Sequence, residues 1–237
     1  MAEKARTVLV TGASRGIGQA ISLLLLGQGH NVIGLARDFS RFGAYPRFHP
    51  GTIDLADLDA LPARLGALAK DWPRVDALVL NAGQGRFGSL EEFSYGQIRA
   101  LVDLNFTAQA FVTRAFLPLM KRHPPGDVLF IGSEAALWGG RRGAVYSASK
   151  AALRGFAQAL RDECGRAGIR VSVINPGMVR TEFFAELPFA PGDDAANAIL
   201  AEEVAATVGH VLASRPELVF DEINLSPLKK VLRFKGD

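Results

Sequence analysis

Residues 7–18 read TVLVTGASRGIG, in which a short apolar run leads into three closely spaced glycines. Thr7 to Thr11 predicts a buried strand, and Gly16 to Gln28 predicts the helix that follows it. Glycines permit a tight turn and let the backbone approach a pyrophosphate, while free N–H groups at the start of a helix attract phosphate. A glycine-rich turn between a strand and a helix therefore predicts a dinucleotide site made by Gly12, Ser14, Arg15, Gly16, Ile17 and Gly18.

The same alternation of apolar runs and longer helical stretches continues along the chain. Further strands are predicted at 31–36, 52–53, 75–80, 127–131, 169–174 and 218–225, and further helices at 58–71, 94–122, 144–167 and 198–213. Near-continuous apolar strands that alternate with helices indicate a parallel sheet covered on both faces. We therefore predict an α/β fold, a doubly wound Rossmann-like parallel sheet of about seven strands, formed as a single domain by residues 1–237.

Composition narrows the class of protein. The chain has 237 residues, of which 49% are hydrophobic, so it can bury one large core. Its 27 basic and 24 acidic residues are spread along the sequence, which does not indicate binding to nucleic acid or to a membrane. Cys164 is the only cysteine, and the histidines are scattered, so we expect a reduced, cytoplasmic protein without a metal site. The basic run at 229–235 is predicted to be a solvated terminus rather than a membrane or anion patch.

The end of the second predicted strand indicates which dinucleotide is bound. It reads Leu35-Ala36-Arg37-Asp38. An acidic residue here usually bonds the ribose 2′-hydroxyl of NAD, whereas an arginine accommodates the 2′-phosphate of NADP. Arg37 and Arg15 could hold that phosphate between two guanidinium groups. We predict NADP(H) rather than NAD(H), although Asp38 could take the acidic role if the strand runs longer.

A second constellation lies near the middle of the chain. Tyr146 and Lys150 are four residues apart, so they share one face of a predicted helix, and Ser133 lies upstream. A nearby ammonium favours the phenolate, so Lys150 is expected to lower the pKa of Tyr146 from its ordinary value of about 10. Such a tyrosine could exchange a proton with an alcohol or carbonyl oxygen, and Ser133 would bond the same oxygen.

Taken together, these motifs resemble those of the short-chain dehydrogenase/reductase family, in its main single-domain branch. The resemblance covers roughly residues 6–181, and its motifs occur in the family's order and spacing. They are Thr11–Gly18, Asp54-Leu55, Asn81-Ala82-Gly83, Asn105, Ser133, Tyr146 with Lys150, and Asn175-Pro176-Gly177 with Thr181. Each motif alone is weak evidence, but the set is specific.

The resemblance implies a role for each matching residue. Asp54 and Leu55 would contact the adenine, and Asn105 would hold a water that relays protons. Lys150 would also bond the ribose next to the nicotinamide. The remaining cofactor contacts would line the cleft or position the nicotinamide amide, through Asn81, Ala82, Gly83, Pro176, Gly177, Val179 and Thr181. In the family, the equivalents of the helices predicted at 94–122 and 144–167 pack across a two-fold axis, which implies a homodimer or homotetramer.

The expected activity is a hydride transfer between NADP(H) and a carbonyl or secondary alcohol substrate, with Tyr146 as the general acid/base. The irregular stretch 181–197 is predicted to be a substrate lid. The pocket is expected at Gln84–Phe87, Glu134–Arg142, Met178 and Phe183-Phe184. Its aromatic residues suggest an apolar or aromatic small-molecule substrate, and three arginines, Arg86, Arg141 and Arg142, could instead bind an acidic group.

Three alternatives stay open at this point. The chain could be an NAD(H)-dependent alcohol dehydrogenase of the same family, if Asp38 controls the ribose pocket. It could be an epimerase or dehydratase that holds NAD tightly, although such relatives usually carry a larger C-terminal substrate portion. It could also be a non-catalytic NADP(H)-sensing interaction protein, against which the complete set of Asn105, Ser133, Tyr146 and Lys150 argues.

Overall fold

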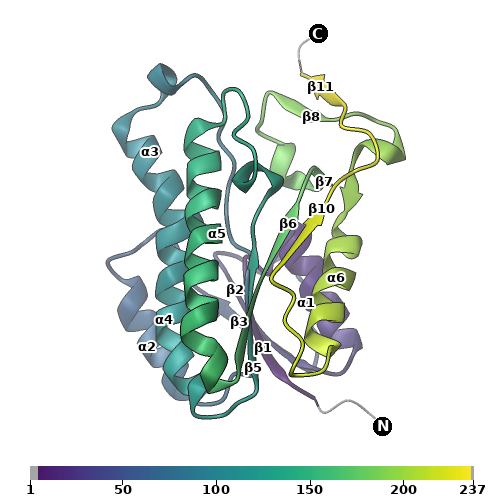
Figure 1. The fold of residues 1–237 in the computed structure, drawn as a ribbon. Coiled ribbons are helices and arrows are strands. Elements are labelled where there is room, and N and C mark those ends of the chain that lie inside the picture. The colour runs from purple at the N-terminus through teal and green to yellow at the C-terminus, as the bar shows by residue number, and fades with distance from the viewer. Residues whose placement is uncertain (1–4, 236–237) are drawn as a thin grey trace.

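The computed structural model describes residues 5–235, and its centre is a parallel sheet of seven strands (Figure 1). The order across the sheet is β10-β6-β5-β4-β1-β2-β3. The strands are β1 (Thr7–Thr11), β2 (Asn31–Ala36), β3 (Phe48–Thr52), β4 (Ala77–Leu80), β5 (Gly126–Ile131), β6 (Ile169–Pro176) and β10 (Glu222–Leu225). The predicted doubly wound, Rossmann-like fold is confirmed.

Helices cover both faces of this sheet, as Figure 1 shows. On one face, α1 (Gly16–Gly27) and α6 (Ala201–Ala213) pack together over β1, β4 and β5 through a core that includes Ile21, Leu25, Val204 and Val208. On the other face, α2 (Leu61–Asp71), α4 (Ala108–Lys121) and α5 (Ala144–Cys164) share a second core with the sheet. Because both faces are covered, every residue of β5 and β6 is buried, and apolar residues predominate in both strands.

The strand order reverses direction between β1 and β4. The chain moves outward from β1 to β2 and β3, then crosses back to β4 beside β1. In open parallel sheets, ligands bind outside the carboxyl ends of the strands at such a switch point. The segments that follow these two strands are Gly12–Gly18 and Asn81-Ala82-Gly83, so the topology brings the two glycine-containing motifs together.

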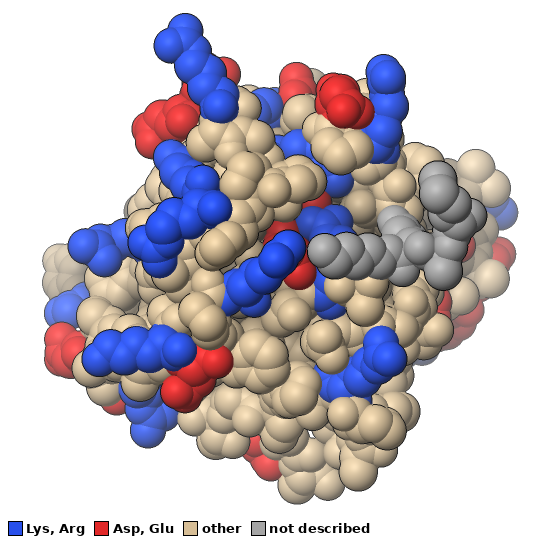
Figure 2. Space-filling view, turned by 90° about the horizontal axis from the view of Figure 1, so that it is seen from below, with Lys and Arg blue, Asp and Glu red and all other residues tan. Residues whose placement is uncertain are grey.

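The opposite end of the sheet is held by a buried ionic cluster. Asp127 accepts hydrogen bonds from Arg170 Nε at 2.6 Å and from Arg6. Arg170 also donates to carbonyl oxygens at the end of α6, among them those of Val211 and Ser214. Figure 2 views the molecule from this end and shows Lys and Arg side chains spread over the face with acidic ones among them. Several of them lie in the last turns of helices, where positive charge is favourable.

The helix predicted at 94–122 is not regular throughout. It consists of α3 (Tyr95–Val102), a π-helical turn at Asp103–Thr107, and α4. Other bounds differ from the predicted ones by a few residues. The third strand covers Phe48–Thr52 instead of 52–53, and the last helix begins at Ala201 instead of at 198. That helix starts late because Ile199–Leu200 forms the short strand β9, which pairs with β7 (Val179–Arg180).

The basic run at 229–235 is exposed at every residue, as predicted for a solvated terminus, but part of it is ordered as a strand. Leu232–Phe234 forms β11, which pairs antiparallel with β8 (Phe189–Pro191) above the carboxyl edge of the sheet (Figure 1). None of the helices within residues 5–235 is long and apolar enough to cross a membrane.

Candidate active site

A cavity of about 1570 Å³ opens at the carboxyl ends of β1, β4, β5 and β6. It exceeds the roughly 300–1,000 Å³ of a typical pocket for a drug-sized ligand, so it has room for a dinucleotide and a substrate together. Its lining includes most of the residues that the sequence singles out, from Gly12 in the glycine loop to Thr181 after β7. Gly18 and Asn105 are not part of the lining; they lie behind it and support it.

The glycine loop fits a phosphate-binding role. Gly12 has φ +65°, and a Cβ on Gly18 would lie 2.1 Å from the carbonyl oxygen of Gly12, so only glycine allows this close turn. The side chain of Arg15, at the N-cap of α1, makes no capping hydrogen bond, and the first turn contains no acidic residue. The first N–H groups of α1 are therefore available to an anion at the positive end of the helix.

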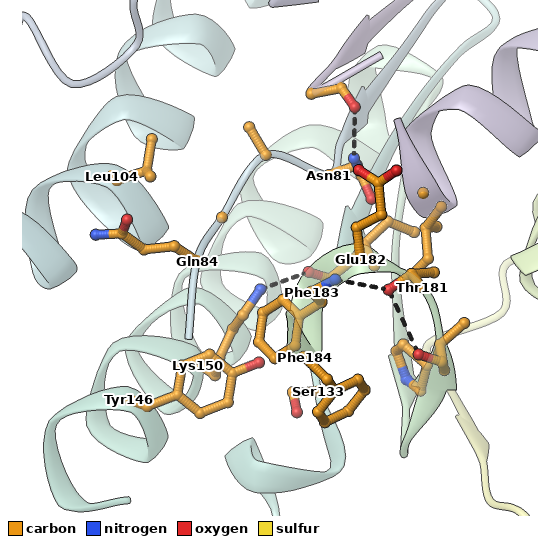
Figure 3. A pocket seen from close by; sticks show the side chains of 18 of the residues that line it. Asn81, Gln84, Leu104, Ser133, Tyr146, Lys150, Thr181, Glu182, Phe183 and Phe184 are labelled. Carbon is orange, nitrogen blue, oxygen red and sulfur yellow. Dashed lines mark hydrogen bonds between the residues drawn. The ribbon is translucent and has the colours of Figure 1, made fainter. Parts of the chain in front are cut away.

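Thr11 and Asn81 join the glycine loop to β4. The hydroxyl of Thr11 accepts hydrogen bonds from the backbone N–H groups of Asn81 and Ala82, both at 2.9 Å. Asn81 Nδ2 donates to the carbonyl oxygens of Thr11, at 3.0 Å, and Gly12. Thr11 donates in turn to Gln109 Oε1 on α4, at 3.1 Å. The floor of the crevice is thus fixed by side chains whose polar groups are satisfied (Figure 3).

The expected adenosine end carries three arginines. Arg15, Arg37 and Arg41 all line this part of the cavity, and the sequence analysis did not single out Arg41. Asp38 also lines it, but both of its oxygens accept hydrogen bonds from Ser40, one from the N–H and one from the hydroxyl, each at 2.8 Å. The N–H of Ser40, helped by its hydroxyl, holds the pKa of Asp38 below its ordinary value.

Asp54 and Leu55, which the resemblance assigns to the adenine, follow β3 and line the same part of the cavity. Asp54 is exposed, and its Oδ1 accepts a hydrogen bond from the N–H of Ala56 at 2.9 Å, so it caps its own turn. Leu55 is buried beside Leu35 in the core under the cavity. Both residues therefore line the part of the cavity to which the resemblance assigns the adenine.

Ser133, Tyr146 and Lys150 converge on one wall of the cavity (Figure 3). Ser133 follows β5 and caps a short 3-10 turn at Glu134–Ala136, while Tyr146 and Lys150 lie one turn apart on α5. Lys150 Nζ donates to the carbonyl oxygen of Ile131 at 3.0 Å, which fixes the ammonium beside the end of β5. All three side chains are buried, so their orientations are constrained by packing.

Burial dominates the protonation of this group. It raises the pKa of Tyr146 above its ordinary value; the hydrogen bond with Ser133 opposes this shift, and the negative charge of Glu134 adds to it. The same burial lowers the pKa of Lys150 to about 8. The expectation that Lys150 lowers the pKa of Tyr146 is therefore wrong for the protein chain alone, because burial of the phenol raises that pKa. Tyr146 is held as a neutral proton donor.

Asn105 sits in the π-helical turn between α3 and α4 and is fully buried. Its Oδ1 accepts from the N–H of Gln84 at 2.9 Å, and its Nδ2 donates to the carbonyl oxygen of Gln84 and to Ser149 Oγ, each at 3.0 Å. Ser149 donates to the carbonyl oxygen of Tyr146 at 2.7 Å. Asn105 therefore links the segment after β4 to the helix that carries Tyr146, behind the cavity.

The end of β6 and the segment after it form another wall of the cavity. Pro176, Gly177, Val179 and Thr181 all line the cavity, as the resemblance requires. A Cβ on Gly177 would lie 3.0 Å from Glu134 Oε2, which brings this segment against the residue next to Ser133. Thr181 lies beside Gly16 of the glycine loop, at about 3.5 Å from the position of a Cβ there.

Aromatic rings surround Tyr146. Its ring centroid lies 5.1 Å from that of Phe87 and 6.2 Å from that of Phe183. Phe189 extends the cluster, at 5.0 Å from Phe87 and 6.0 Å from Phe184. Figure 3 shows Phe183 and Phe184 on the cavity side of Ser133 and Tyr146. The space in front of the phenol is therefore largely apolar.

Two of the three arginines considered for an acidic substrate, Arg141 and Arg142, line the cavity, and Arg86 does not. Arg142 pairs with Glu92 at 3.3 Å. Of these three arginines, Arg141 alone lines the cavity without an ion pair to a described residue. Trp138 and Met178 line it as expected, although Trp138 is 80% exposed.

The structure adds residues to the cavity that sequence reasoning missed. Among them are Ser40 and Arg41 near the glycine loop, and Lys230, Leu232 and Phe234 on the substrate side. A sequence signal existed for the last group, because Leu232, Arg233 and Phe234 alternate as a short strand does.

Comparison with known proteins agrees with this geometry. The family model described as short chain dehydrogenase matches residues 6–190. The chain is 32% identical over 206 residues to NADP-dependent 3-hydroxy acid dehydrogenase YdfG of Escherichia coli (strain K12), covering 84% of this chain and 83% of that protein. It is 35% identical over 197 residues to 17-beta-hydroxysteroid dehydrogenase type 1 of Mus musculus, covering 78% of this chain but only 57% of the mouse protein.

Solved structures give the same result. A short-chain dehydrogenase from Streptomyces avermitilis superposes with a TM-score of 0.82 at 30% identity, covering 95% of this chain and 89% of that one. The closed form of a serine dehydrogenase complexed with NADP+ superposes with a TM-score of 0.82, also at 30% identity, covering 92% of this chain and 94% of that one. The chain belongs to the short-chain dehydrogenase/reductase family of oxidoreductases.

The lowered pKa of Lys150 predicts how stability depends on pH. Between its folded value of about 8 and its ordinary value of 10.5, the unfolded chain holds a proton that the folded chain has released, so stability rises with pH. The free energy of unfolding of the wild type, minus that of Lys150→Met, should rise from pH 8 to 10 by up to about 1.4 kcal/mol per unit. Urea unfolding across this range measures the difference.

The exposed Lys70 provides the control, because Lys70→Met should give a pH dependence parallel to that of the wild type. If the Lys150→Met curve is also parallel to the wild-type curve, the burial argument for Lys150 is wrong.

Proposed function

We propose that the protein is an NADP(H)-dependent oxidoreductase that transfers hydride between the nicotinamide and a carbonyl or secondary alcohol substrate. The observation that carries this proposal is the convergence of Ser133, Tyr146 and Lys150 on the cavity that also contains an uncapped, glycine-rich helix start. The name of the Escherichia coli relative, an NADP-dependent hydroxy acid dehydrogenase, supports the same chemistry. We place the protein in the cytoplasm, with reduction as its working direction.

A bound nicotinamide would supply the hydride for the carbonyl carbon, so negative charge would develop on the carbonyl oxygen. Ser133 and Tyr146 bond that oxygen, and Tyr146 donates the proton that completes the alcohol. The raised pKa of Tyr146 suits this direction, because the phenol stays protonated at neutral pH. The Lys150 ammonium then stabilises the phenolate that remains. Asn105 holds the backbone of Gln84 by a hydrogen bond. We propose that it also binds the water that relays a proton back to Tyr146.

The remaining cofactor contacts follow from their positions. Gly12, Ser14, Gly16, Ile17 and Gly18 would form the turn that receives the pyrophosphate at the start of α1. Asp54 and Leu55 would flank the adenine, and Asn81, Ala82 and Gly83 would line the middle of the cleft. Pro176, Gly177, Val179 and Thr181 would hold the nicotinamide amide, and Lys150 the neighbouring ribose.

Replacing Tyr146 tests the catalytic assignment. Tyr146→Phe keeps the ring but removes the proton donor, so turnover of NADPH with a ketone should fall by about 10²–10⁴-fold. NADPH binding, followed by nicotinamide fluorescence, should be nearly unchanged. Tyr95→Phe is the matched control, since Tyr95 is 93% exposed and outside the cavity.

If Tyr146→Phe retains wild-type turnover, Tyr146 is not the acid. If neither protein turns over any carbonyl compound while both bind NADPH, the sensing protein becomes the better account.

The preference for NADP(H) rests on charge at the adenosine end. Arg15, Arg37 and Arg41 line this region, and Asp38 is engaged by Ser40 rather than left to bond a ribose hydroxyl. Arg15 makes only a loose ion pair with Glu182, at 3.9 Å between exposed groups, which leaves its guanidinium able to turn to a phosphate. Two or more guanidinium groups suit a dianionic phosphate.

We expect NADPH to bind more tightly than NADH. Arg37→Ala should raise the Kd for NADPH by about 10- to 100-fold, because a charge-assisted hydrogen bond contributes about 1.5–3 kcal/mol. The Kd for NADH should hardly change. Arg99→Ala, at an exposed arginine on α3, should alter neither value. Tighter binding of NADH by the wild type would mean that Asp38 controls the ribose pocket.

The substrate side supports a neutral, apolar carbonyl compound. The rings of Phe87, Phe183, Phe184 and Phe189 lie around the space in front of Tyr146. Of Arg141 and Arg142, which also line the cavity, Arg142 is engaged by Glu92. The mouse relative is named as a hydroxysteroid dehydrogenase, which is consistent with an apolar substrate. We treat residues 1–237 as one catalytic domain in which 181–197 is the substrate lid.

A homodimer or homotetramer is proposed from the exposed face of α5. Ala148, Ala151, Ala152, Gly155 and Ala159 are exposed there, and their small side chains allow a second helix to approach closely. Light scattering at micromolar concentration should give two or four times the monomer mass of 25.4 kDa. Ala152→Arg should lower that mass, while Gln158→Arg, on an exposed residue two turns along, provides a comparison. A monomeric wild type would contradict the proposal.

A further inference from the structure

Residues 230–235, here called the strap, lie over the substrate side of the cavity. Leu232, Arg233 and Phe234 pair antiparallel with Pro191, Ala190 and Phe189, so the strap and the lid form one small sheet. Lys235 closes the other end, because its Nζ donates to the carbonyl oxygens of Phe184 and Ala185 at 2.6 and 2.7 Å. Figure 1 shows this small sheet above the carboxyl edge of the central sheet.

An ion pair ties the strap to the catalytic wall. Lys230 Nζ lies 2.5 Å from Glu134 Oε2, and Glu134 directly follows Ser133. Glu134 is the less exposed partner, at 29% against 57%, so the lysine reaches inward to it. Pro227, just before the strap, and Glu134 both lie within 3.1 Å of the position of a Cβ on Gly177. The strap therefore contacts the segments on both sides of the cavity.

The face of the strap that lines the cavity is apolar apart from Lys230, which pairs with Glu134. Leu232 and Phe234 line the cavity, and Arg233 points to Asp193, at 2.8 Å, as the alternation of a strand requires. The Phe234 ring is 6.5 Å from that of Phe189, which is 5.0 Å from Phe87, and Phe87 is 5.1 Å from Tyr146. A continuous series of rings thus leads from the catalytic phenol to the strap.

We propose that the strap is the outer wall of the substrate pocket, in which Phe234 and Leu232 contact the far end of an apolar substrate and the Lys230–Glu134 pair holds them there. This inference rests on the proposed function, because it assigns the residues that select the substrate of the same site. Phe234 is a specificity-determining residue, and Lys230 and Glu134 are positioning residues. The pocket accordingly favours carbonyl compounds with an apolar arm long enough to reach from Tyr146 to Phe234.

The first arm of the test compares substrate lengths. NADPH oxidation is measured with acetone and with a series of methyl ketones that carry longer alkyl chains. In the wild type, kcat/KM should rise with chain length and level off. Phe234→Ala should lower kcat/KM for the long ketones by about 10-fold or more, through KM, and lower it much less for acetone, since a lost apolar contact changes discrimination by about 10–200-fold.

Leu228→Ala is the matched control, because Leu228 precedes the strap, is 87% exposed and does not line the cavity. It should behave as the wild type does. If Phe234→Ala leaves the length dependence intact, or lowers kcat/KM for acetone and long ketones alike, the strap does not select the substrate.

The second arm tests the ion pair without relying on turnover. Amide hydrogen exchange is followed for Gly192 and Lys235, whose N–H groups donate to Val231 and Pro188 across the lid and strap. Lys230→Met and Glu134→Gln should each speed this exchange, and the double variant should add little, because both remove one interaction. In a separate kinetic assay, the fold increase in KM that these variants cause for long ketones should exceed the fold decrease in kcat that they cause for acetone.

Lys229→Met provides the control, since the described contacts of Lys229 are made by its backbone. Exchange as slow in Lys230→Met as in Lys229→Met would overturn the positioning role. A wild type that oxidises NADPH with none of the ketones would instead defeat the proposed function, and the exchange result would still report whether the ion pair holds the strap.

Discussion

The site depends on the junction between β1 and β4, where one threonine and one asparagine fasten two chain segments that come from opposite halves of the sheet. Thr11 is fully buried and uses its hydroxyl for three partners, while Asn81 returns hydrogen bonds to the loop. Each bond contributes only about 1 kcal/mol net, but an unsatisfied buried group here would cost about 1–3 kcal/mol. The glycine loop can therefore occupy only one position relative to β4.

Buried asparagine side chains also link the chain segments around Ser133 and Tyr146 by hydrogen bonds. Asn175 accepts from the N–H of Ser133 at 3.2 Å and donates to Asn224 and Glu222 of β10. Asn105 links Gln84 to Ser149, because it accepts a hydrogen bond from the N–H of Gln84 and donates one to the hydroxyl of Ser149. Among the described residues, no buried side-chain polar atom lacks a hydrogen-bond partner. A fully satisfied polar network is rigid, so the groups that meet the substrate are positioned before it arrives.

The sequence was sufficient for the parts that depend on spacing. The glycine loop, the Tyr146–Lys150 pair and the alternation of strands and helices follow from local patterns, and the structure contains all three. It was not sufficient where tertiary environment decides. The π-helical turn at Asn105 keeps the helical hydrophobic period, and the raised pKa of Tyr146 depends on burial. The charge of the strap predicted an exposed terminus. The sequence did not show that two of its lysines bond other segments, Lys230 to Glu134 and Lys235 to the lid.

The central claim is that a dinucleotide lies across the β1–β4 junction with its nicotinamide beside Tyr146. Diffraction from crystals grown with NADP+ tests it most directly. The account predicts the pyrophosphate at the start of α1, the 2′-phosphate against Arg37, and the nicotinamide between Tyr146 and the segment that contains Gly177. A dinucleotide bound in the reverse direction, or with its nicotinamide away from Tyr146, would contradict it.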